Sequence, residues 1–464
     1  MKRLVRLAPL TFLFLVAGCM VGPNYKRPAV HLPAAYRGAA PAPASAVSLG
    51  SEKWWQVFKD PVLVKLIHTA IAQNYDVRIA ATRVLQAQAD LGITRSNQFP
   101  SLSGSAGISS LQNAKTSKVF PAYQVNSGHI SLSAIWDLDF WGKYRRETQV
   151  ARAQLLSTQW GRRAVITSVV ASVAASYFQL RALDSEMAIA RRTLASRQDS
   201  LRLTSVLATN GSASALDVSQ ARQLVYAASE TIPSLQLQIA QQENLLSTLL
   251  GQNPGAIAQG LPIAQQPEPA TVPAGLPSQL IDRRPDVLEA EANLMAASAE
   301  IGVIKADLFP NISLTGTGGL ESNALNHIIS VGAENWSAAV DVTQPIFQAG
   351  ALRAGVHLAQ AQWQEMLLTY RQTILTALEQ VSDGLVAYDR DREYTRRQQQ
   401  LEQAAEETDH LSMVLYNTGG ASYLQVLTSQ TNLFAAQLGV VQAELNERLA
   451  LVQLYQALGG GWQQ

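Results

Sequence analysis

The sequence predicts a mainly α-helical protein with a smaller β portion, built from one structural unit that occurs twice. Residues 91–103 align with residues 301–313 at a shift of 210, and Gly142 aligns with Gly350 at a shift of 208. Long stretches rich in Ala, Leu and Gln have apolar residues at helical spacing, whereas shorter stretches alternate polar and apolar residues one by one. Each repeat is therefore expected to form a helix, two strands, a long helix, a turn and a further helix.

The helices are expected at matching places in the two repeats. They span residues 61–92, 142–209 and 215–250 in the first repeat, and 285–307, 350–418 and 423–458 in the second. Pro233 lies inside one of them and predicts a kink, and Asn210-Gly211 is a turn signal between two others. At about 1.5 Å per residue the longest helix is about 100 Å and its return partner about 55 Å, so the first helix is expected to cover the remaining length.

The N-terminus predicts export. Basic residues (Lys2, Arg3, Arg6) precede a short apolar run at positions 7–17, which is typical of a secretory signal peptide. This run is too short to cross a bilayer of about 30 Å, which needs about 20 apolar residues. We therefore expect residues 1–18 to be a signal peptide and residues 19–60 an extended lipidated segment. The first repeat then spans 61–252, a linker rich in Pro, Gln and Ala spans 253–277, and the second repeat spans 278–464.

Cys19 is the only cysteine, so an intrachain disulfide is impossible. One interpretation is a small buried thiol inside an ordinary signal peptide. However, Val16-Ala17-Gly18-Cys19 resembles the bacterial lipobox, in which the thiol is acylated and becomes the first residue. Several acyl chains make a stable membrane anchor. Met20 stands where an Asp favours inner-membrane retention, and this favours the outer membrane.

Composition argues against several function classes. Only 15% of the 464 residues are charged and the formal net charge is +1, so nothing favours nucleic acid as a partner. The six histidines show no metal-ligand spacing, and the chain has neither a phosphate-binding loop nor a nucleophile elbow. We expect no enzyme activity, catalytic residue, metal or cofactor. Arg283-Arg284-Pro285-Asp286 favours a charged helix start over an anion site.

The uncharged stretch 164–180 has two interpretations. It is either a transmembrane helix or, more in keeping with its length and its Ser and Thr content, a helix-packing face.

The expected strands have one polar and one apolar face. In residues 130–140 the apolar side chains of Ile130, Leu132, Trp136, Leu138 and Phe140 alternate with Ser131, Ser133, Asp137 and Asp139. Residues 101–109, 311–317 and 336–343 alternate in the same way. A half-buried sheet with a solvated face is one interpretation. In an exported, lipidated chain a membrane β-barrel is the other, and aromatic residues at the strand ends (Trp136, Phe140, Trp141, Trp336, Phe347) suit an interfacial girdle. Four strands cannot enclose a lumen, so several chains must then share one barrel.

The chain resembles the TolC-like outer membrane factors, specifically the lipoprotein efflux branch that includes OprM- and NodT-type proteins. The resemblance is carried by residues 19–28, Trp54-Trp55, residues 275–286, Tyr416-Asn-Thr-Gly419 and the ending at 458–462. It implies a homotrimer with a 12-stranded β-barrel on a long periplasmic α-helical barrel. It also implies a periplasmic adaptor protein and an inner-membrane efflux transporter as partners, and passive export of small toxic compounds or drugs. Protein secretion is an alternative, and a scaffolding lipoprotein is another.

The same resemblance implies where the functional residues lie. The turns near Gly211 and Gly419 would form the periplasmic tip, which contacts the adaptor, and Leu424, Tyr416 and Asp217 would help to close it. Gln425 and Thr428 stand where the family often has carboxylates, and Ala421 where it has a basic residue, which disfavours an acidic, cation-binding gate. A purely packing role for Leu424 is the alternative.

Overall fold

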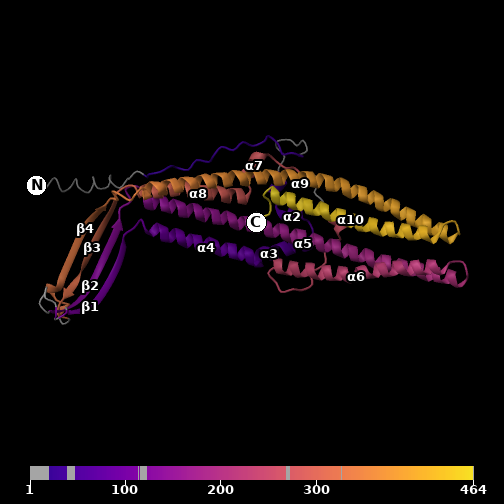
Figure 1. The fold of residues 1–464 in the computed structure, drawn as a ribbon, viewed down its shortest axis with the longest axis horizontal. Coiled ribbons are helices and arrows are strands. Elements are labelled where there is room, and N and C mark those ends of the chain that lie inside the picture. The colour runs from indigo at the N-terminus through magenta and orange to yellow at the C-terminus, as the bar shows by residue number, and fades with distance from the viewer. Residues whose placement is uncertain are drawn as a thin grey trace. The chain divides into compact units, whose positions relative to one another are not determined.

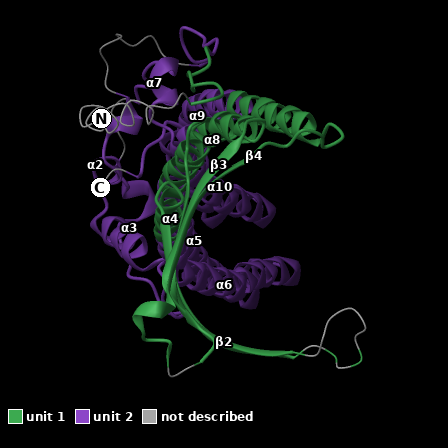
Figure 2. Ribbon diagram, turned by 90° about the vertical axis from the view of Figure 1, so that its left-hand side faces the viewer, with its two compact units in different colours: residues 1–29, 83–159, 289–371 green, residues 30–82, 160–288, 372–464 purple. Residues whose placement is uncertain are grey.

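The structure is a computed structural model that describes residues 20–38, 48–112, 114, 116, 123–267, 272–324 and 327–462. The chain forms two compact units, each drawn from both repeats (Figure 2). Unit 1 comprises residues 1–29, 83–159 and 289–371, and unit 2 comprises residues 30–82, 160–288 and 372–464. The expected signal peptide and Cys19 lie outside the described residues.

Helices dominate both repeats (Figure 1). The first repeat contains α3 (Pro61–Gln73), α4 (Tyr75–Ser96), β1 (Ser101–Gln112), β2 (Gln124–Asp137), α5 (Lys143–Thr209) and α6 (Ala215–Leu249). The second contains α7 (Pro277–Ile281), α8 (Pro285–Ala306), β3 (Asn311–Ser322), β4 (Glu334–Thr343), α9 (Ala351–Asn417) and α10 (Tyr423–Ala457). Short helices η1 (Leu49–Ser51) and α2 (Trp54–Val57) precede the first repeat, η2 (Ile263–Gln265) lies in the linker, and η4 (Val331–Ala333) precedes β4.

The duplication predicted from the sequence is confirmed at the level of the elements. Helices α8, α9 and α10 begin and end at the residues that match α4, α5 and α6 at shifts of 210, 208 and 208, respectively. Strand β3 matches β1 at 210 in the same way. Two copies of one sequence pattern thus give two copies of one local structure.

The prediction of one unbroken helix over residues 61–92 is wrong. The helix ends at Gln73 and a second begins at Tyr75, continuing to Ser96. Asn74 separates them because its side-chain oxygen accepts hydrogen bonds from Asp76 N at 2.8 Å and Val77 N at 3.1 Å, which is a helix N-cap. Its amide also donates to Leu249 O at 2.9 Å and so ties the break to the end of α6.

Unit 1 contains the four strands and the helix segments next to them in the chain. The strands form one antiparallel sheet in the order β1-β2-β3-β4. The register is continuous, since Leu102 lies opposite Ala134, Trp136 opposite Leu314, and Leu314 opposite Val340. Antiparallel neighbours that are consecutive in the chain need only short connections, except for the long return from β2 to β3.

Unit 2 has a helical core with an ordered carboxylate inside it. Asp60 is buried and begins α3, where it accepts a hydrogen bond from Val62 N. Its carboxylate also accepts hydrogen bonds from the Tyr177 hydroxyl, Gln266 Nε2 and Leu261 N. These bonds lower the pKa of Asp60 although burial alone would raise it. The network joins α3, α5 and the linker.

The uncharged stretch of α5 is a packing face. Helix α5 is long and apolar enough to cross a membrane, but most of its apolar window is buried within the protein. Its inward side chains are fully or almost fully covered (Ile166, Val169, Val170, Val173, Ala174, Tyr177 and Leu180). The structure therefore supports helix packing over a transmembrane helix for residues 164–180.

Candidate functional site

The sheet of unit 1 has one face of hydroxyl groups. Ser103 and Ser133 lie directly opposite each other with their Oγ atoms 2.7 Å apart, and Ser105 and Ser131 follow at 2.9 Å. Between β3 and β4, Thr317 Oγ1 and Ser337 Oγ are 2.7 Å apart. Cross-strand hydroxyl pairs stabilise a sheet and leave further hydrogen-bonding capacity for water.

The opposite face of the sheet is apolar and exposed. Leu102 is 72% exposed, Trp336 82% and Val340 65%. The register puts these apolar residues on one face, since Gly318 lies opposite Trp336 and Leu314 opposite Val340. The alternation predicted from the sequence is confirmed for residues 130–137 and for the other three strands. An exposed apolar band of this kind marks a surface that contacts a protein or a membrane.

The strand was expected to extend to residue 140, but it ends earlier. Strand β2 ends at Asp137, and Asp139 instead precedes α5. The Asp139 carboxylate accepts hydrogen bonds from Tyr144 N at 3.1 Å and Arg145 N at 3.0 Å, and it pairs with the Arg145 guanidinium at 3.0 Å. The N–H groups in the first turn of a helix have no partner within the helix and favour an acidic one. Asp139 therefore belongs to the start of α5 and does not continue the alternation of β2.

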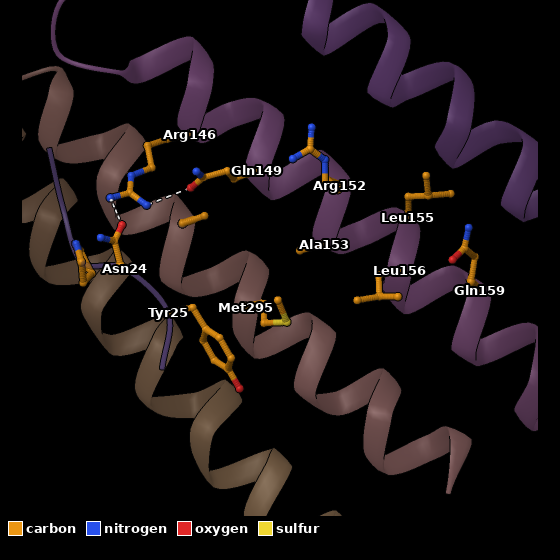
Figure 3. Close-up of a pocket in the computed structure, with 12 residues that line it drawn as sticks. Asn24, Tyr25, Arg146, Gln149, Arg152, Ala153, Leu155, Leu156, Gln159 and Met295 are labelled. Atoms are coloured by element: carbon orange, nitrogen blue, oxygen red, sulfur yellow. Dashed lines mark hydrogen bonds between the residues drawn. The ribbon is translucent and has the colours of Figure 1, made fainter. Parts of the chain in front are cut away.

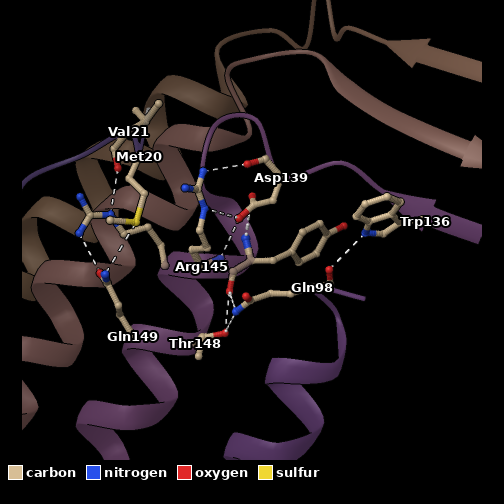
Figure 4. Close-up of polar contacts among 10 residues, drawn as sticks. Met20, Val21, Gln98, Trp136, Asp139, Arg145, Thr148 and Gln149 are labelled. Carbon is tan, nitrogen blue, oxygen red and sulfur yellow. Dashed lines mark hydrogen bonds and ion pairs between the residues drawn. The ribbon is translucent and has the colours of Figure 1, made fainter. Parts of the chain in front are cut away.

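The junction between strands and helices is tightly hydrogen-bonded (Figure 4). Trp136 Nε1 donates to Gln98 O at 3.1 Å, and Trp141 Nε1 donates to Pro310 O at 2.8 Å. The Trp141 ring also stacks on Phe309 with centroids 4.8 Å apart. Val21 N donates to Trp141 O at 3.0 Å, so the segment that follows Cys19 is bound to this junction.

The two turns that were expected to form the tip lie in unit 2 and share one geometry. Gly211 has a φ of +73° and Gly419 a φ of +78°, a region that favours glycine. In the first turn Ser212 N donates to Leu207 O at 2.8 Å, and in the second Gly420 N donates to Leu415 O at 2.8 Å. Both are Schellman helix ends, which satisfy the last carbonyl groups of α5 and α9.

Asp217 has a structural role at the first turn. Its carboxylate accepts a hydrogen bond from Ser214 N at 2.8 Å, and Ser214 Oγ accepts one from Asp217 N at 3.2 Å, which is a capping box. In the second turn Gln425 takes the same place, since its Oε1 accepts from Ser422 N at 3.2 Å. The Asp217 charge also acts on the second turn, because it raises the pKa of Tyr416 together with the larger effect of burial.

Tyr416 and Leu424 lie in different surroundings. The Tyr416 ring meets Tyr423 edge to face at 5.4 Å, next to a buried cluster of Ala221, Tyr423 and Val426. Leu424 points away from this cluster and is 58% exposed. In the described chain, therefore, Leu424 is not a core residue, and the structure does not support a packing role for it within the chain. The structure brings Tyr416 and Asp217 together but leaves Leu424 free to contact something else.

Three polar contacts between helices near the turns, two of them buried, were not predicted from the sequence. Ser429 Oγ donates to Asp409 Oδ1 at 2.9 Å, and burial raises the pKa of Asp409. Gln430 Nε2 donates to Ser200 Oγ at 3.2 Å. Arg197, which is 4% exposed, donates to the backbone oxygen of Leu224 at 3.0 Å, with Phe434 against its guanidinium (Arg197 Cζ to the ring centroid 5.2 Å). Polar residues at inward helix positions are the only sequence signal for these contacts.

Two further expectations concern metal ligands and a possible anion site at residues 283–286. No group of three or more potential metal ligands occurs among the described residues. Arg284 pairs with Asp286 at 2.6 Å and donates to Ala457 O and Gln380, so this guanidinium is engaged inside unit 2 rather than presented to an anion.

Comparisons with known proteins agree with this architecture. The sequence model of the outer membrane efflux protein family matches residues 66–252 and 276–460, one match for each repeat. The chain belongs to the outer membrane efflux protein family. The solvent efflux pump outer membrane protein SrpC of Pseudomonas putida is 35% identical over 98% of each chain. The probable outer membrane lipoprotein SilC of Salmonella typhimurium is 30% identical over 99% of each chain.

The fold of this efflux protein is also that of a solved channel. The open-state structure of the Neisseria gonorrhoeae outer membrane channel MtrE superposes with a TM-score of 0.88 at 26% identity, covering 96% of this chain and 99% of MtrE. The TolC-like fold and the outer-membrane location predicted from the sequence are confirmed by these matches.

Proposed function

We propose that this efflux protein is the exit duct of a tripartite efflux system, and that it works as a homotrimer. The sheet of unit 1 carries this proposal. It has one hydroxyl face, one exposed apolar face, and two outer strands, β1 and β4, each with one described neighbour. In hydrocarbon every backbone N–H and C=O must be paired, so the sheet has to close. Bacterial outer-membrane barrels have about 8 strands or more, and three chains of four strands give about 12.

The two faces then acquire functions. The apolar face with Trp336 and Val340 contacts lipid, and the hydroxyl face with Ser133 and Thr317 lines a wet lumen. Such a lining selects little, because hydroxyl groups serve many solutes as donors or acceptors. The duct therefore conducts passively, and an inner-membrane efflux transporter supplies the energy and the choice of substrate. The solvent efflux named for SrpC supports small toxic compounds as the exported class.

The tip is proposed as the gate and as the contact with a periplasmic adaptor protein. Three chains would bring six turns together, each ending at Gly211 or Gly419. The exposed Leu424 side chains would then meet near the axis and exclude water, with Tyr416 and Asp217 as polar supports. Gln425 and Thr428 are uncharged, so neither can close the gate through charge. Both make local hydrogen bonds instead, Gln425 in a helix cap and Thr428 to Leu424 O.

Cys19 is proposed as the site of lipidation that anchors each chain. The lipobox-like sequence before it supports this, as does the contact of Val21 with Trp141 at the base of the sheet. Labelled palmitate should enter the wild-type protein and not the Cys19→Ser variant. Equal labelling of both would refute the proposal.

Deletion and complementation test the proposed function as a whole. A deletion strain should become sensitive to several solvents, dyes and drugs, and the wild-type gene should restore resistance. Purified protein in detergent should have a native mass of about three chains and should conduct ions in planar bilayers. A stable monomer that conducts, or a deletion that changes only the secretion of a protein, would contradict the proposal.

A further inference from the structure

A cavity of about 510 Å³ lies within unit 1, between the N-terminal segment and helices α5 and α8 (Figure 3). Its lining is mainly apolar, with Leu155 and Leu156 from α5 and Met295 and Ala299 from α8. A mostly apolar cavity of this volume with a few polar groups is typical of a small-ligand site. Neither the gate nor the sheet uses it.

One wall of the cavity is a segment that we call the strap, residues 20–27. Gly22 in the strap has a φ of +93°, and a Cβ there would lie 2.5 Å from Gly302 Cα, so strap and helix are in direct backbone contact. Tyr25 donates to Glu291 Oε1 at 3.0 Å, and Arg27 Nη2 pairs with Glu291 at 2.5 Å. These contacts hold the strap against α8.

The charged side chains that line the cavity are all positive. Its lining includes Arg146 and Arg152 but neither Asp nor Glu. Arg146 is 3% exposed and is used by the strap, since it donates to Val21 O, Gly22 O and Asn24 Oδ1. Arg152 is exposed, and no hydrogen bond or ion pair of its guanidinium occurs within the described residues. A free guanidinium next to an apolar wall favours an anionic group attached to a hydrocarbon.

We propose that this cavity binds an anionic amphiphile. The hydrocarbon lies against Leu155, Leu156 and Met295, and a carboxylate, sulfate or phosphate headgroup pairs with Arg152. Two other cavities differ in charge, since one contains Asp139 and Asp307 and the other Asp184 and Glu243 beside their basic residues. The proposed ligand is either a membrane lipid with an anionic headgroup or a free single-chain amphiphile. The site does not depend on the duct function.

Photolabelling of the full-length protein tests this site and distinguishes the two sources. One arm adds dodecanoate with a diazirine in its chain to protein in a neutral polymer belt. The other reconstitutes the protein in vesicles of phosphatidylcholine with a diazirine-labelled phosphatidylglycerol. Saturable labelling of peptides containing residues 152–159 or 295–299 is expected in at least one arm, and the arm identifies the source. Excess unlabelled dodecanoate should compete, whereas dodecanol should not.

Substitutions make the test specific. Arg152→Gln should weaken the labelling by about tenfold, because a hydrogen bond to a charged group is lost. Arg353→Gln changes another exposed arginine of unit 1 that does not line the cavity, and it should leave labelling unchanged. Leu156→Gln should weaken labelling by either probe without altering its dependence on Arg152. Unsaturable labelling, labelling only elsewhere, or equal labelling of the Arg152→Gln variant would overturn the proposal.

Discussion

The two turns of unit 2 share a backbone but differ in their side chains. Both have a left-handed glycine, a Schellman helix end and a side chain that accepts a hydrogen bond from the N-cap N–H, at positions related by 208 residues. Yet Tyr416 and Tyr423 in the second turn replace Ala208 and Ala215 in the first. Duplication has kept the scaffold and changed the residues that pack between the two hairpins. The tyrosines of the packing between the two hairpins therefore come from the second turn alone, and they pack against Ala221 and Leu201 of the first hairpin.

The largest expected effect comes from removing that packing. Tyr423 is 4% exposed and lies in the cluster with Ala221 and Val426. Tyr423→Ala should destabilise the second turn by about 3 kcal/mol or more, the usual result of a large-to-small change in a core. Compared with the wild type, amide hydrogen exchange in the variant should become faster around α10 and should change less near the first turn. If the amides around α10 exchange equally fast in the wild type and the variant, Tyr423 does not stabilise the second turn.

A smaller effect on the fold but a clear effect on conductance is expected at the exposed leucines. Leu216 and Leu424 occupy matching positions and are 64% and 58% exposed. Leu424→Ser should raise channel conductance in planar bilayers, because apolar closure is lost. Leu216→Ser is the matched control and should change it little, and Asp217→Asn should change cation preference only modestly. Unchanged conductance of the assembled Leu424→Ser protein would leave this residue without a gating role.

The shared backbone predicts equal costs at the two glycines. Gly211 and Gly419 have positive φ values, and a Cβ at either would meet no atom within 4 Å. Gly211→Ala and Gly419→Ala should each cost about 1–2 kcal/mol, through backbone strain alone. Thermal unfolding of the two variants should show similar losses. A much larger loss at Gly419 would mean that this turn also makes close contacts in the assembly.

A pH effect should distinguish the second hairpin from the first. Asp409 stands where the first hairpin has Leu201, and burial raises its pKa although its bond from Ser429 opposes this. A carboxyl whose pKa is raised by folding makes its most favourable contribution at low pH, and this is lost as the pH rises through the folded-state pKa. Local stability should therefore fall from acidic to neutral pH. Asp409→Asn should reduce this slope around Asp409, whereas an unchanged slope there would assign it to another group.

The sequence predicts the repeat, the long helices and the strand faces because each depends on local pattern. Glycines at 211 and 419 and the alternation in each strand specify their own geometry. The break at Asn74 was missed because neither Gly nor Pro marks it, and only the cap identifies it. The role of Asp139 at the start of α5 was missed because its position continues the alternation of polar and apolar residues in the strand.

Contacts between distant segments could not be predicted in the same way. Arg197 donates to Leu224 O only because α5 and α6 pack at a particular rotation. The strap and its cavity depend on Gly302, which lies 280 positions from Gly22. Such pairings depend on tertiary packing, which the periodicity of a single segment does not specify.

The central claim is that the apolar face of the sheet contacts lipid and the hydroxyl face contacts water. Val340 and Asp341 are neighbours in β4 and point to opposite faces. Val340→Arg and Asp341→Arg can therefore be compared in one assay, the yield of assembled protein after refolding into vesicles. The account predicts a loss of about 2–4 kcal/mol for Val340→Arg and much less for Asp341→Arg. Equal assembly of the two variants would contradict it.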